Sequence, residues 1–328
     1  MSNRQGRVGR DDDKARGLRR PWSALAVLFL LATQALGGNS SGEVQPESNW
    51  KGSTVLSRDA KSRPIHGYAP INGLKMYYEI EGTGDPLVYI PPAFGFAGLK
   101  SFPALAQSHS VVTVDLQGNG RTADIPGRPI SIEQYAKDVV GLLKYLGISK
   151  ADFFGESYGG NTAAMIAVHY PELVGRVVTY AATFGPPQNT LPADALRAGP
   201  PPTADSRYIQ FQREQYERVA PDPDYWPMVY GKVLGIQWRG FSNEELASIK
   251  APFLIVLGDH DFVRLEHAVE TARLIPTAEL AVIPDASHFV LFSEPDRVIP
   301  IVKHFLEPPE KRIPLATAAT GYHPGETR

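Results

Sequence analysis

The sequence G-E-S-Y-G-G at positions 155–160 constrains the fold of this chain more than any other stretch. It follows the short apolar run 151–154, which is typical of a buried strand, and it precedes an apolar helical pattern that ends before Pro171. A turn from strand to helix with a serine at its tip is so sharp that small residues must stand two positions before and after the serine. Gly155 and Gly159 meet that requirement. The pattern therefore predicts a strained turn that projects a serine hydroxyl above a sheet, and a plain strand-to-helix turn is the alternative.

Short apolar runs alternate with helical patterns on both sides of this turn. A hairpin is predicted around Asn72-Gly73, because that dipeptide is the strongest short signal for a tight turn between strands. An amphipathic helix is predicted from Ser131 to about Leu146. The runs that we interpret as strands are 87–90, 111–116, 151–154, 176–181, 253–257 and 280–283, and the first three are typical of buried strands. Continuous apolar strands separated by helices predict an α/β fold, a mostly parallel sheet with helices on both faces.

The alternation of strands and helices stops between about residues 184 and 249. Residues 185–204 are rich in Pro, Gly and Ala, and aromatic residues follow in a helical stretch. These aromatic residues are Tyr208, Phe211, Tyr216, Tyr225, Trp226, Tyr230 and Trp238. We expect a small helical lid over 184–249, inserted into a core made of 64–183 and 250–307. A helical subdomain that only packs on the core is the alternative.

The first 38 residues have the pattern of an export signal. An Arg-rich polar region precedes an apolar run from Trp22 to about Leu36, and small polar residues end that run. The run is shorter than the roughly 20 residues that a membrane span needs. We expect a cleaved signal peptide and a periplasmic or extracellular protein, with an uncleaved anchor or a disordered extension as alternatives. Residues 39–63 are expected to form a linker, and residues 308–328 a disordered tail.

The composition excludes several classes of function. The formal net charge is −2, and no basic cluster is available for nucleic acid. The absence of cysteine excludes a thiolate nucleophile, a disulfide framework and a cysteine-ligated metal. We therefore expect a protein that acts on a small molecule without a cofactor or metal. It would meet a membrane only through an uncleaved N-terminal segment.

A serine hydroxyl is a poor nucleophile at neutral pH, so Ser157 needs a base, and the base needs an acid to orient it. In proteins with this type of turn, the order along the chain is nucleophile, acid, base. Asp259 and Asp261 follow the predicted strand 253–257, and His288 follows the last strand. Functional groups collect in such loops at the carboxyl ends of parallel strands. The order Ser157, Asp261, His288 fits, with Asp259 as the alternative acid.

From about His66 to Leu306 the sequence resembles the α/β-hydrolase superfamily, in its single-domain, esterase-like branch with a helical lid. The matching segments are NGLKMYYEIEGTGDPLVYI, DLQGNGRT, FFGESYGGNTAA, APFLIVLGDHDFV and IPDASHFVLFSEPDRV. The resemblance implies the α/β-hydrolase fold, with Asp261 as the acid and His288 as the base. It implies that Asp259 shapes its loop and that Asp115 is structural.

The resemblance also implies an oxyanion hole made by the backbone N–H groups of Ala93 and Tyr158. The family usually has His-Gly-x after the strand, whereas this chain has Pro91-Pro92 before Ala93. Proline has no N–H group, but Pro91 and Pro92 stand at the His-Gly positions, and the donor position is that of Ala93. We therefore expect the oxyanion hole to persist in a stiffer loop.

Glu156 stands directly before the serine, and G-E-S-Y-G-G also resembles serine carboxypeptidases, in which the glutamate helps to hold a substrate carboxylate. Those enzymes are longer and rely on disulfides, which this chain cannot form. Glu156 is therefore expected to be a turn residue or a partner of the residues around the site.

These features predict a serine hydrolase that cleaves uncharged carboxylic esters through an acyl-enzyme. The charges of the predicted lid are mixed in sign, so no basic cluster is available for a charged substrate. Haloalkane dehalogenases and epoxide hydrolases resemble this fold, but they carry aspartate where this chain has Ser157. Carbon–carbon bond hydrolases, cofactor-free perhydrolases, aminopeptidases and lactonases share the triad and remain alternatives. A non-catalytic binding protein is the alternative from another class.

Overall fold

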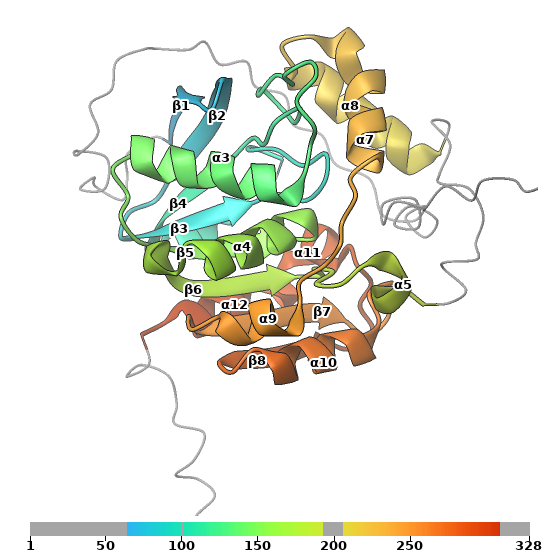
Figure 1. Ribbon diagram of the computed structural model, residues 1–328. Helices are drawn as coiled ribbons and strands as arrows, with labels where there is room; N and C mark the ends of the chain where they lie inside the picture. Colours follow the sequence, from blue (N-terminus) through green and yellow to red (C-terminus); the bar gives the residue numbers. More distant parts are fainter. Residues whose placement is uncertain (1–63, 100–101, 193–205, 309–328) are drawn as a thin grey trace, which may run out of the picture.

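The computed structural model describes residues 64–99, 102–192 and 206–308 (Figure 1). The predicted signal peptide, the linker and nearly all of the predicted tail lie outside these residues. Within the described residues, no helix combines the length and the apolar character that crossing a membrane requires.

Eight strands form one sheet, in the order β1-β2-β4-β3-β5-β6-β7-β8. The strands β1 and β2 pair antiparallel, as do β2 and β4, and all other neighbours are parallel. This arrangement confirms the predicted α/β fold with a mostly parallel sheet. The strands are β1 (Ile65–Ile71), β2 (Leu74–Glu81), β3 (Asp85–Ile90), β4 (His109–Val114), β5 (Ala151–Glu156), β6 (Val174–Tyr180), β7 (Phe253–Gly258) and β8 (Ala278–Ile283).

Helices cover both faces of this sheet (Figure 1). The helices α3, α4, α9 and α10 pack with one apolar core, and α2, α11 and α12 pack with a second core on the opposite face. The helices are α2 (Pro103–Ala106), α3 (Ile132–Tyr145), α4 (Tyr158–His169), α5 (Pro187–Thr190), α7 (Arg207–Val219), α8 (Trp226–Leu234), α9 (Asn243–Ser248), α10 (Leu265–Leu274), α11 (Val290–Ser293) and α12 (Ile299–Leu306). Short 3-10 helices span Pro171–Leu173, Pro223–Tyr225 and Pro295–Arg297.

The hairpin predicted around Asn72-Gly73 joins β1 to β2. Both turn residues have positive φ, 49° at Asn72 and 85° at Gly73, as a tight two-residue hairpin turn of the I′ type requires. Ile71 pairs with Leu74 directly across the turn. The turn therefore sets the register of the first two strands, and the prediction is confirmed.

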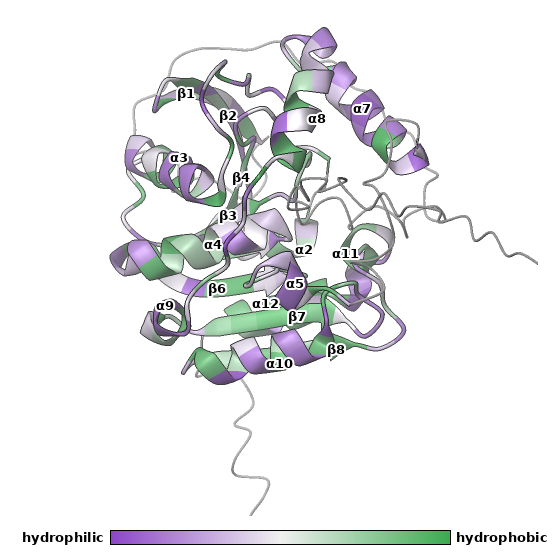
Figure 2. Ribbon diagram, turned by 45° about the vertical axis from the view of Figure 1, so that its right-hand side comes forward, coloured by the Kyte–Doolittle hydropathy of each residue, from purple (hydrophilic) through white to green (hydrophobic). Residues whose placement is uncertain are grey.

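Two helices of the predicted lid, α7 and α8, lie side by side and apart from the helices that cover the sheet (Figures 1 and 2). The Tyr208 ring on α7 lies 5.6 Å from the ring of Phe289, which follows β8. The Trp226 ring on α8 lies 5.0 Å from the ring of Phe94, which follows β3. The α7–α8 pair therefore covers the carboxyl ends of the parallel strands. The later helix α9 instead packs against α4 and α10 on the core.

Candidate active site

Ser157 occupies the turn between β5 and α4, with φ 53° and ψ −115°. Positive φ is costly for a residue with a side chain, so surrounding contacts must hold this conformation. A Cβ on Gly155 would lie 2.2 Å from the Gly159 carbonyl oxygen, and one on Gly159 would lie 2.0 Å from the Ile90 carbonyl oxygen. Only glycine fits at both positions. The backbone therefore forms the sharp turn that the sequence predicts, with Ser157 at its tip.

His288 and Asp261 form a buried pair. The distance between His288 Nδ1 and Asp261 Oδ1 is 2.9 Å, and both side chains are almost fully buried. Asp261 Oδ1 also accepts the Val263 N–H at 2.9 Å. When Nδ1 of a neutral imidazole donates to the carboxylate, Nε2 is left as the acceptor. The pair therefore has the form that a base and its orienting acid require.

Two aromatic rings fix the position of the His288 ring. The Phe262 ring stacks on it with 3.8 Å between centroids, and the Phe289 ring meets it edge-on at 5.4 Å. The sequence analysis missed this support. Its only signal in the sequence is that these residues directly follow Asp261 and His288.

The other aspartate of the loop, Asp259, has a different set of contacts. Its Oδ1 accepts the Ala286 N–H at 3.0 Å, and this hydrogen bond is the main reason that the pKa of Asp259 is lowered. The neighbouring His260 is exposed. The structure brings Asp261, and not Asp259, to His288, while Asp259 joins its own loop to the loop that carries the histidine.

The loop after β3 forms a tight turn in which the Gly95 N–H donates to the Pro92 carbonyl at 2.9 Å. Phe94, the third residue of the turn, has φ 62°. Ala93 is the second residue. Among the described residues, neither the Ala93 N–H nor the Tyr158 N–H has a hydrogen-bond acceptor. Both backbone N–H groups are therefore free to donate to a group from outside the described residues.

Asp115 is fully buried and connects two loops near the site. Its Oδ1 accepts the Ala97 N–H at 2.5 Å, and its Oδ2 accepts the Arg121 N–H at 2.7 Å. Burial raises the pKa of Asp115 to about 7, and the two hydrogen bonds oppose that rise. A Cβ on Gly120 would lie 2.3 Å from Asp115 Oδ2, so the loop closes tightly around the carboxylate. Asp115 therefore ties the loop that carries Ala93 to the loop after β4.

Glu156 is buried at the end of β5, where it pairs with Tyr180 of β6 in the sheet register. The Tyr89 hydroxyl donates to Glu156 Oε2 at 2.8 Å. The Tyr180 hydroxyl donates to the Ser287 carbonyl at 3.0 Å, one residue before His288. Glu156 therefore holds Tyr89, and its neighbour in the sheet, Tyr180, bonds the loop that carries His288.

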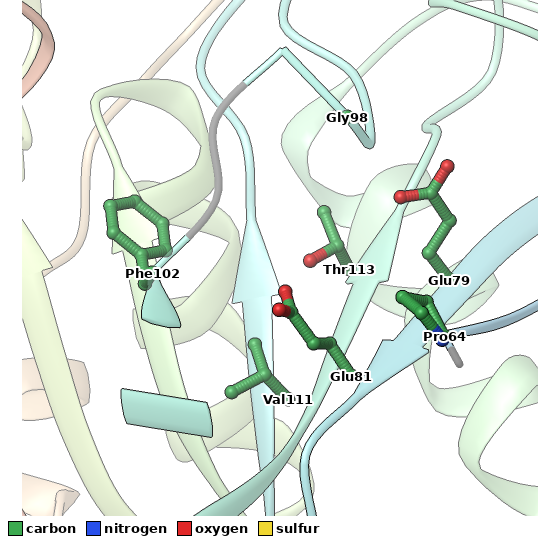
Figure 3. A pocket seen from close by; sticks show the side chains of 7 residues that line it. All are labelled: Pro64, Glu79, Glu81, Gly98, Phe102, Val111 and Thr113. Carbon is green, nitrogen blue, oxygen red and sulfur yellow. The ribbon is translucent and has the colours of Figure 1, made fainter. Parts of the chain in front are cut away.

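A separate small pocket of about 60 Å³ lies beside β2 and β4 (Figure 3). Its lining includes Glu79 and Glu81, and it contains none of the three predicted catalytic residues. The Tyr77 hydroxyl donates to Glu79 at 2.8 Å. Within the described part of the chain, no group of three or more His, Cys, Asp or Glu side chains is placed to hold a metal ion.

In a sheet with this strand order, a parallel strand leads through a strained turn into a helix, and a serine stands at the tip of the turn. This combination defines a class of hydrolases. The chain belongs to the alpha/beta hydrolase family, whose family model matches residues 65–301. The predicted resemblance is therefore confirmed, and the protein is a hydrolase of this family.

Relatives within the family act on different bonds. The chain is 26% identical over 282 residues to a 2-hydroxy-6-oxononadienedioate/2-hydroxy-6-oxononatrienedioate hydrolase of Burkholderia vietnamiensis, which covers 77% of this chain and 98% of that relative. It is 23% identical to an sn-1-specific diacylglycerol lipase of Danio rerio, over 76% of this chain and 87% of the lipase. The structure matches a 2-hydroxy-6-oxo-6-phenylhexa-2,4-dienoate hydrolase of a Rhodococcus strain with a TM-score of 0.62 and 19% identity, over 74% of this chain and 98% of that one. At 19% identity, the similarity to the Rhodococcus structure supports the fold and nothing about the activity.

Proposed function

We propose that the protein cleaves carboxylic esters through an acyl-enzyme intermediate, with Ser157 as nucleophile, His288 as base and Asp261 as the acid that orients the base. The observation that carries the proposal is the 2.9 Å contact between His288 Nδ1 and Asp261 Oδ1 in a chain whose serine stands on a strained turn. This pairing leaves Nε2 of the histidine to take a proton.

The proposed reaction has two halves. His288 Nε2 takes the proton of the Ser157 hydroxyl as the oxygen attacks the carbonyl carbon of the ester. The N–H groups of Ala93 and Tyr158 stabilise the oxyanion that forms. His288 then gives its proton to the departing alcohol, which leaves an acyl group on Ser157. In the second half a water molecule loses a proton to His288, attacks the acyl carbon and releases the carboxylic acid, and the proton returns to Ser157.

The charges of the α7–α8 pair support an uncharged substrate. The three arginines of α7 are exposed and face solvent: Arg207, Arg213 and Arg218. Lys232 donates to Asp124 at 2.5 Å, and that carboxylate is fully buried. This part of the chain therefore offers no buried, unpaired cation to a substrate carboxylate. Binding of the substrate would depend mainly on apolar contact.

The second candidate is hydrolysis of a carbon–carbon bond. It is favoured by the relative from Burkholderia vietnamiensis, whose name gives dioate substrates, which carry two carboxylates. A site for such a substrate needs cationic partners. The charges of the α7–α8 pair therefore favour ester hydrolysis over hydrolysis of a carbon–carbon bond.

The deciding experiment compares kcat/KM for matched substrates, with Ser157→Ala as the blank. The set contains neutral p-nitrophenyl esters, their carboxylate-bearing analogues, a peptide amide and a vinylogous diketone acid. We expect a clear preference for the neutral esters. A preference for the diketone acid would transfer the function to carbon–carbon hydrolysis, and a preference for the amide would indicate a peptidase.

A further inference from the structure

The helix α7 turns one polar side chain toward the interior. Its buried residues are Ile209, Gln212 and Tyr216, which share one face because they are three and four positions apart. Gln212 is 7% exposed. Glutamine is seldom buried without hydrogen-bonding partners, so this position needs an explanation.

The buried face of α7 begins at the histidine loop and ends near the oxyanion loop. At its start, the Tyr208 ring lies 5.6 Å from the ring of Phe289, the residue after His288. At its end, the Tyr216 ring lies 5.4 Å from the Trp226 ring. The Trp226 ring in turn lies 5.0 Å from the ring of Phe94, the residue after Ala93.

Gln212 stands one helical turn after Tyr208 and one turn before Tyr216. It therefore lies between the loop that carries His288 and the loop that carries Ala93. These two loops flank the Ser157 turn in the proposed mechanism. Gln212 is thus a buried polar side chain of α7 that lies between these two loops.

The two ends of the Gln212 amide differ in their contacts within the described residues. Burial raises the pKa of Tyr208, and a side-chain hydrogen bond from Gln212 opposes that rise. Gln212 Oε1 is buried and has no hydrogen-bond partner among the described residues. A bond to Tyr208 therefore uses the amide nitrogen, and within the described part of the chain the carbonyl oxygen is an unused acceptor.

We propose that Gln212 Oε1 accepts a hydrogen bond from a hydroxyl group of the substrate, so that the enzyme prefers hydroxylated esters to their alkyl counterparts. The inference rests on the proposed function, since it concerns a substrate bound at Ser157. A neutral amide suits a neutral donor. A buried ammonium group would need a carboxylate, and Glu156, whose charge acts on Tyr208 of α7, already accepts from Tyr89 at 2.8 Å.

The neighbouring contacts of α7 are aromatic, so the hydroxyl group would be the main polar group recognised on this side. Leaving a buried acceptor unpaired costs a free energy that corresponds to about a 10- to 100-fold change in affinity or rate. A site that is built to bond a hydroxyl group rejects the analogue that lacks it for this reason.

The test uses two series of isosteric ester pairs, because the hydroxyl group could stand on either side of the scissile bond. The acyl series compares p-nitrophenyl 3-hydroxybutyrate with p-nitrophenyl 3-methylbutyrate. The alcohol series compares 3-(hydroxymethyl)phenyl acetate with 3-ethylphenyl acetate. We expect the hydroxylated member of at least one pair to have the higher kcat/KM, by about 10- to 100-fold.

Two further esters test the chemistry of the acceptor. The p-nitrophenyl esters of 3-aminobutyric acid and of acetoacetic acid carry an ammonium group and a ketone. A preference for the ammonium ester would assign recognition to a carboxylate and overturn the proposal. A preference for the ketone would place the amide nitrogen at this position, and would overturn it equally.

The variant Gln212→Met removes the acceptor and keeps the length and helix propensity of the side chain. We expect it to lose the preference because kcat/KM falls for the hydroxylated ester and not for its isostere. Its melting temperature should change little, because the variant removes an unpaired buried carbonyl and also loses the hydrogen bond from the amide nitrogen to Tyr208. The matched control is Gln210→Met, an exposed position on the same helix, which should keep the preference.

The results separate the possible failures. Equal kcat/KM within both pairs in the wild type would overturn the proposal. A parallel loss on both members of a pair in Gln212→Met, together with a lower melting temperature, would show a purely structural role and also overturn it. Failure of the proposed function would appear elsewhere, as ester hydrolysis that persists in Ser157→Ala.

Discussion

The backbone of Ser157 is held by hydrogen bonds to two different elements of the fold. Its N–H donates to the Tyr180 carbonyl at 2.8 Å, and its own carbonyl accepts the Asn161 N–H at 3.0 Å. The close approach of Gly159 to the Ile90 carbonyl fixes the first turn of α4. The cost of the positive φ is therefore met by contacts within the chain itself.

Ser157→Ala should leave a folded protein whose hydrolytic activity is lower by several orders of magnitude, since the attacking oxygen is lost. A serine-reactive phosphonate should add its mass to the wild type and leave the variant unlabelled, as intact-mass measurement would show. Labelling of the variant at the wild-type rate would move the nucleophile to another residue.

The two loop aspartates should differ sharply in their effect on turnover. Asp261→Asn should lose about 10⁴ in kcat, because the amide favours the wrong tautomer of His288 and cannot stabilise the imidazolium. Asp259→Asn keeps an acceptor for the Ala286 N–H and should lose far less. The measurement is kcat for both variants on one neutral ester, with melting temperatures as the control for folding. The reverse ranking would make Asp259 the acid.

At the level of elements, α8 is anchored to the core by a side chain and not only by ring contacts. Lys232 Nζ donates to Asp124 Oδ2 at 2.5 Å and to the carbonyls of Ile125 and Arg128 at 3.0 and 3.1 Å. All three acceptors belong to the segment between β4 and α3. Three acceptors satisfy the three donors of an ammonium group, so α8 is held in one position over this segment.

Lys232→Met should destabilise the protein by about 3 kcal/mol, because it leaves the buried Asp124 without its counter-charge. The matched control is Arg213→Met, which breaks an exposed ion pair with Glu217 on α7 and should cost less than about 1 kcal/mol. Urea unfolding of both variants measures the difference. Equal losses in the two variants would show that Lys232 does not anchor the helix.

At the level of the whole molecule, the sequence predicts the sheet well because its central strands contain continuous apolar runs, although the run 280–283 forms β8, which is mostly half-buried or exposed. The run 253–257 becomes β7, whose residues are all buried. The glycines of the Ser157 turn and the Asn72-Gly73 dipeptide are equally direct signals, because each is required by backbone geometry at its own position. The expected order of nucleophile, acid and base along the chain pointed to Asp261 and His288, and the structure shows these two residues in contact.

The sequence could not predict features that depend on contacts between distant segments. Phe94 has positive φ, which no aromatic residue favours, and its ring packs against Trp226 and Tyr230 of α8. Nothing in the charge pattern of α7 distinguished the buried Gln212 from the exposed Gln210. Local sequence patterns report the period of burial, but the packing partner decides which polar residue is covered.

Stability should fall as the pH is lowered, in part because of His267. Burial lowers the pKa of His267 to about 4, and the charge of Arg264 adds to this. The unfolded chain therefore binds a proton at this residue from about pH 6.5 downward, whereas the folded protein resists it. The contribution is fully present above pH 6.5 and is lost between there and pH 4, by about 3 kcal/mol in total.

The measurement is the free energy of unfolding in urea at pH 7.5 and pH 4.5, for the wild type and for His267→Gln. The variant has no titrating group at this position, so its stability should fall by about 2 kcal/mol less between the two pH values. Other titrating groups act equally in both proteins and cancel. An equal fall in both proteins would show that His267 is not buried in its neutral form.

We further propose that the first 38 residues direct export and are removed from the mature protein. The basic region followed by the apolar run from Trp22 to about Leu36 supports this, since the run is too short for an ordinary membrane span. The core that carries Ser157, Asp261 and His288 begins only near residue 64, so cleavage would leave it intact.

Native protein isolated from a host that expresses the full chain should begin near residue 39 when its N-terminus is sequenced. The matched control removes the signal by replacing three apolar residues, Leu28, Leu30 and Leu31, with glutamine, and this variant should stay uncleaved inside the cell. Exported wild-type protein that still begins at Met1 or Ser2 would contradict cleavage and make the segment an anchor.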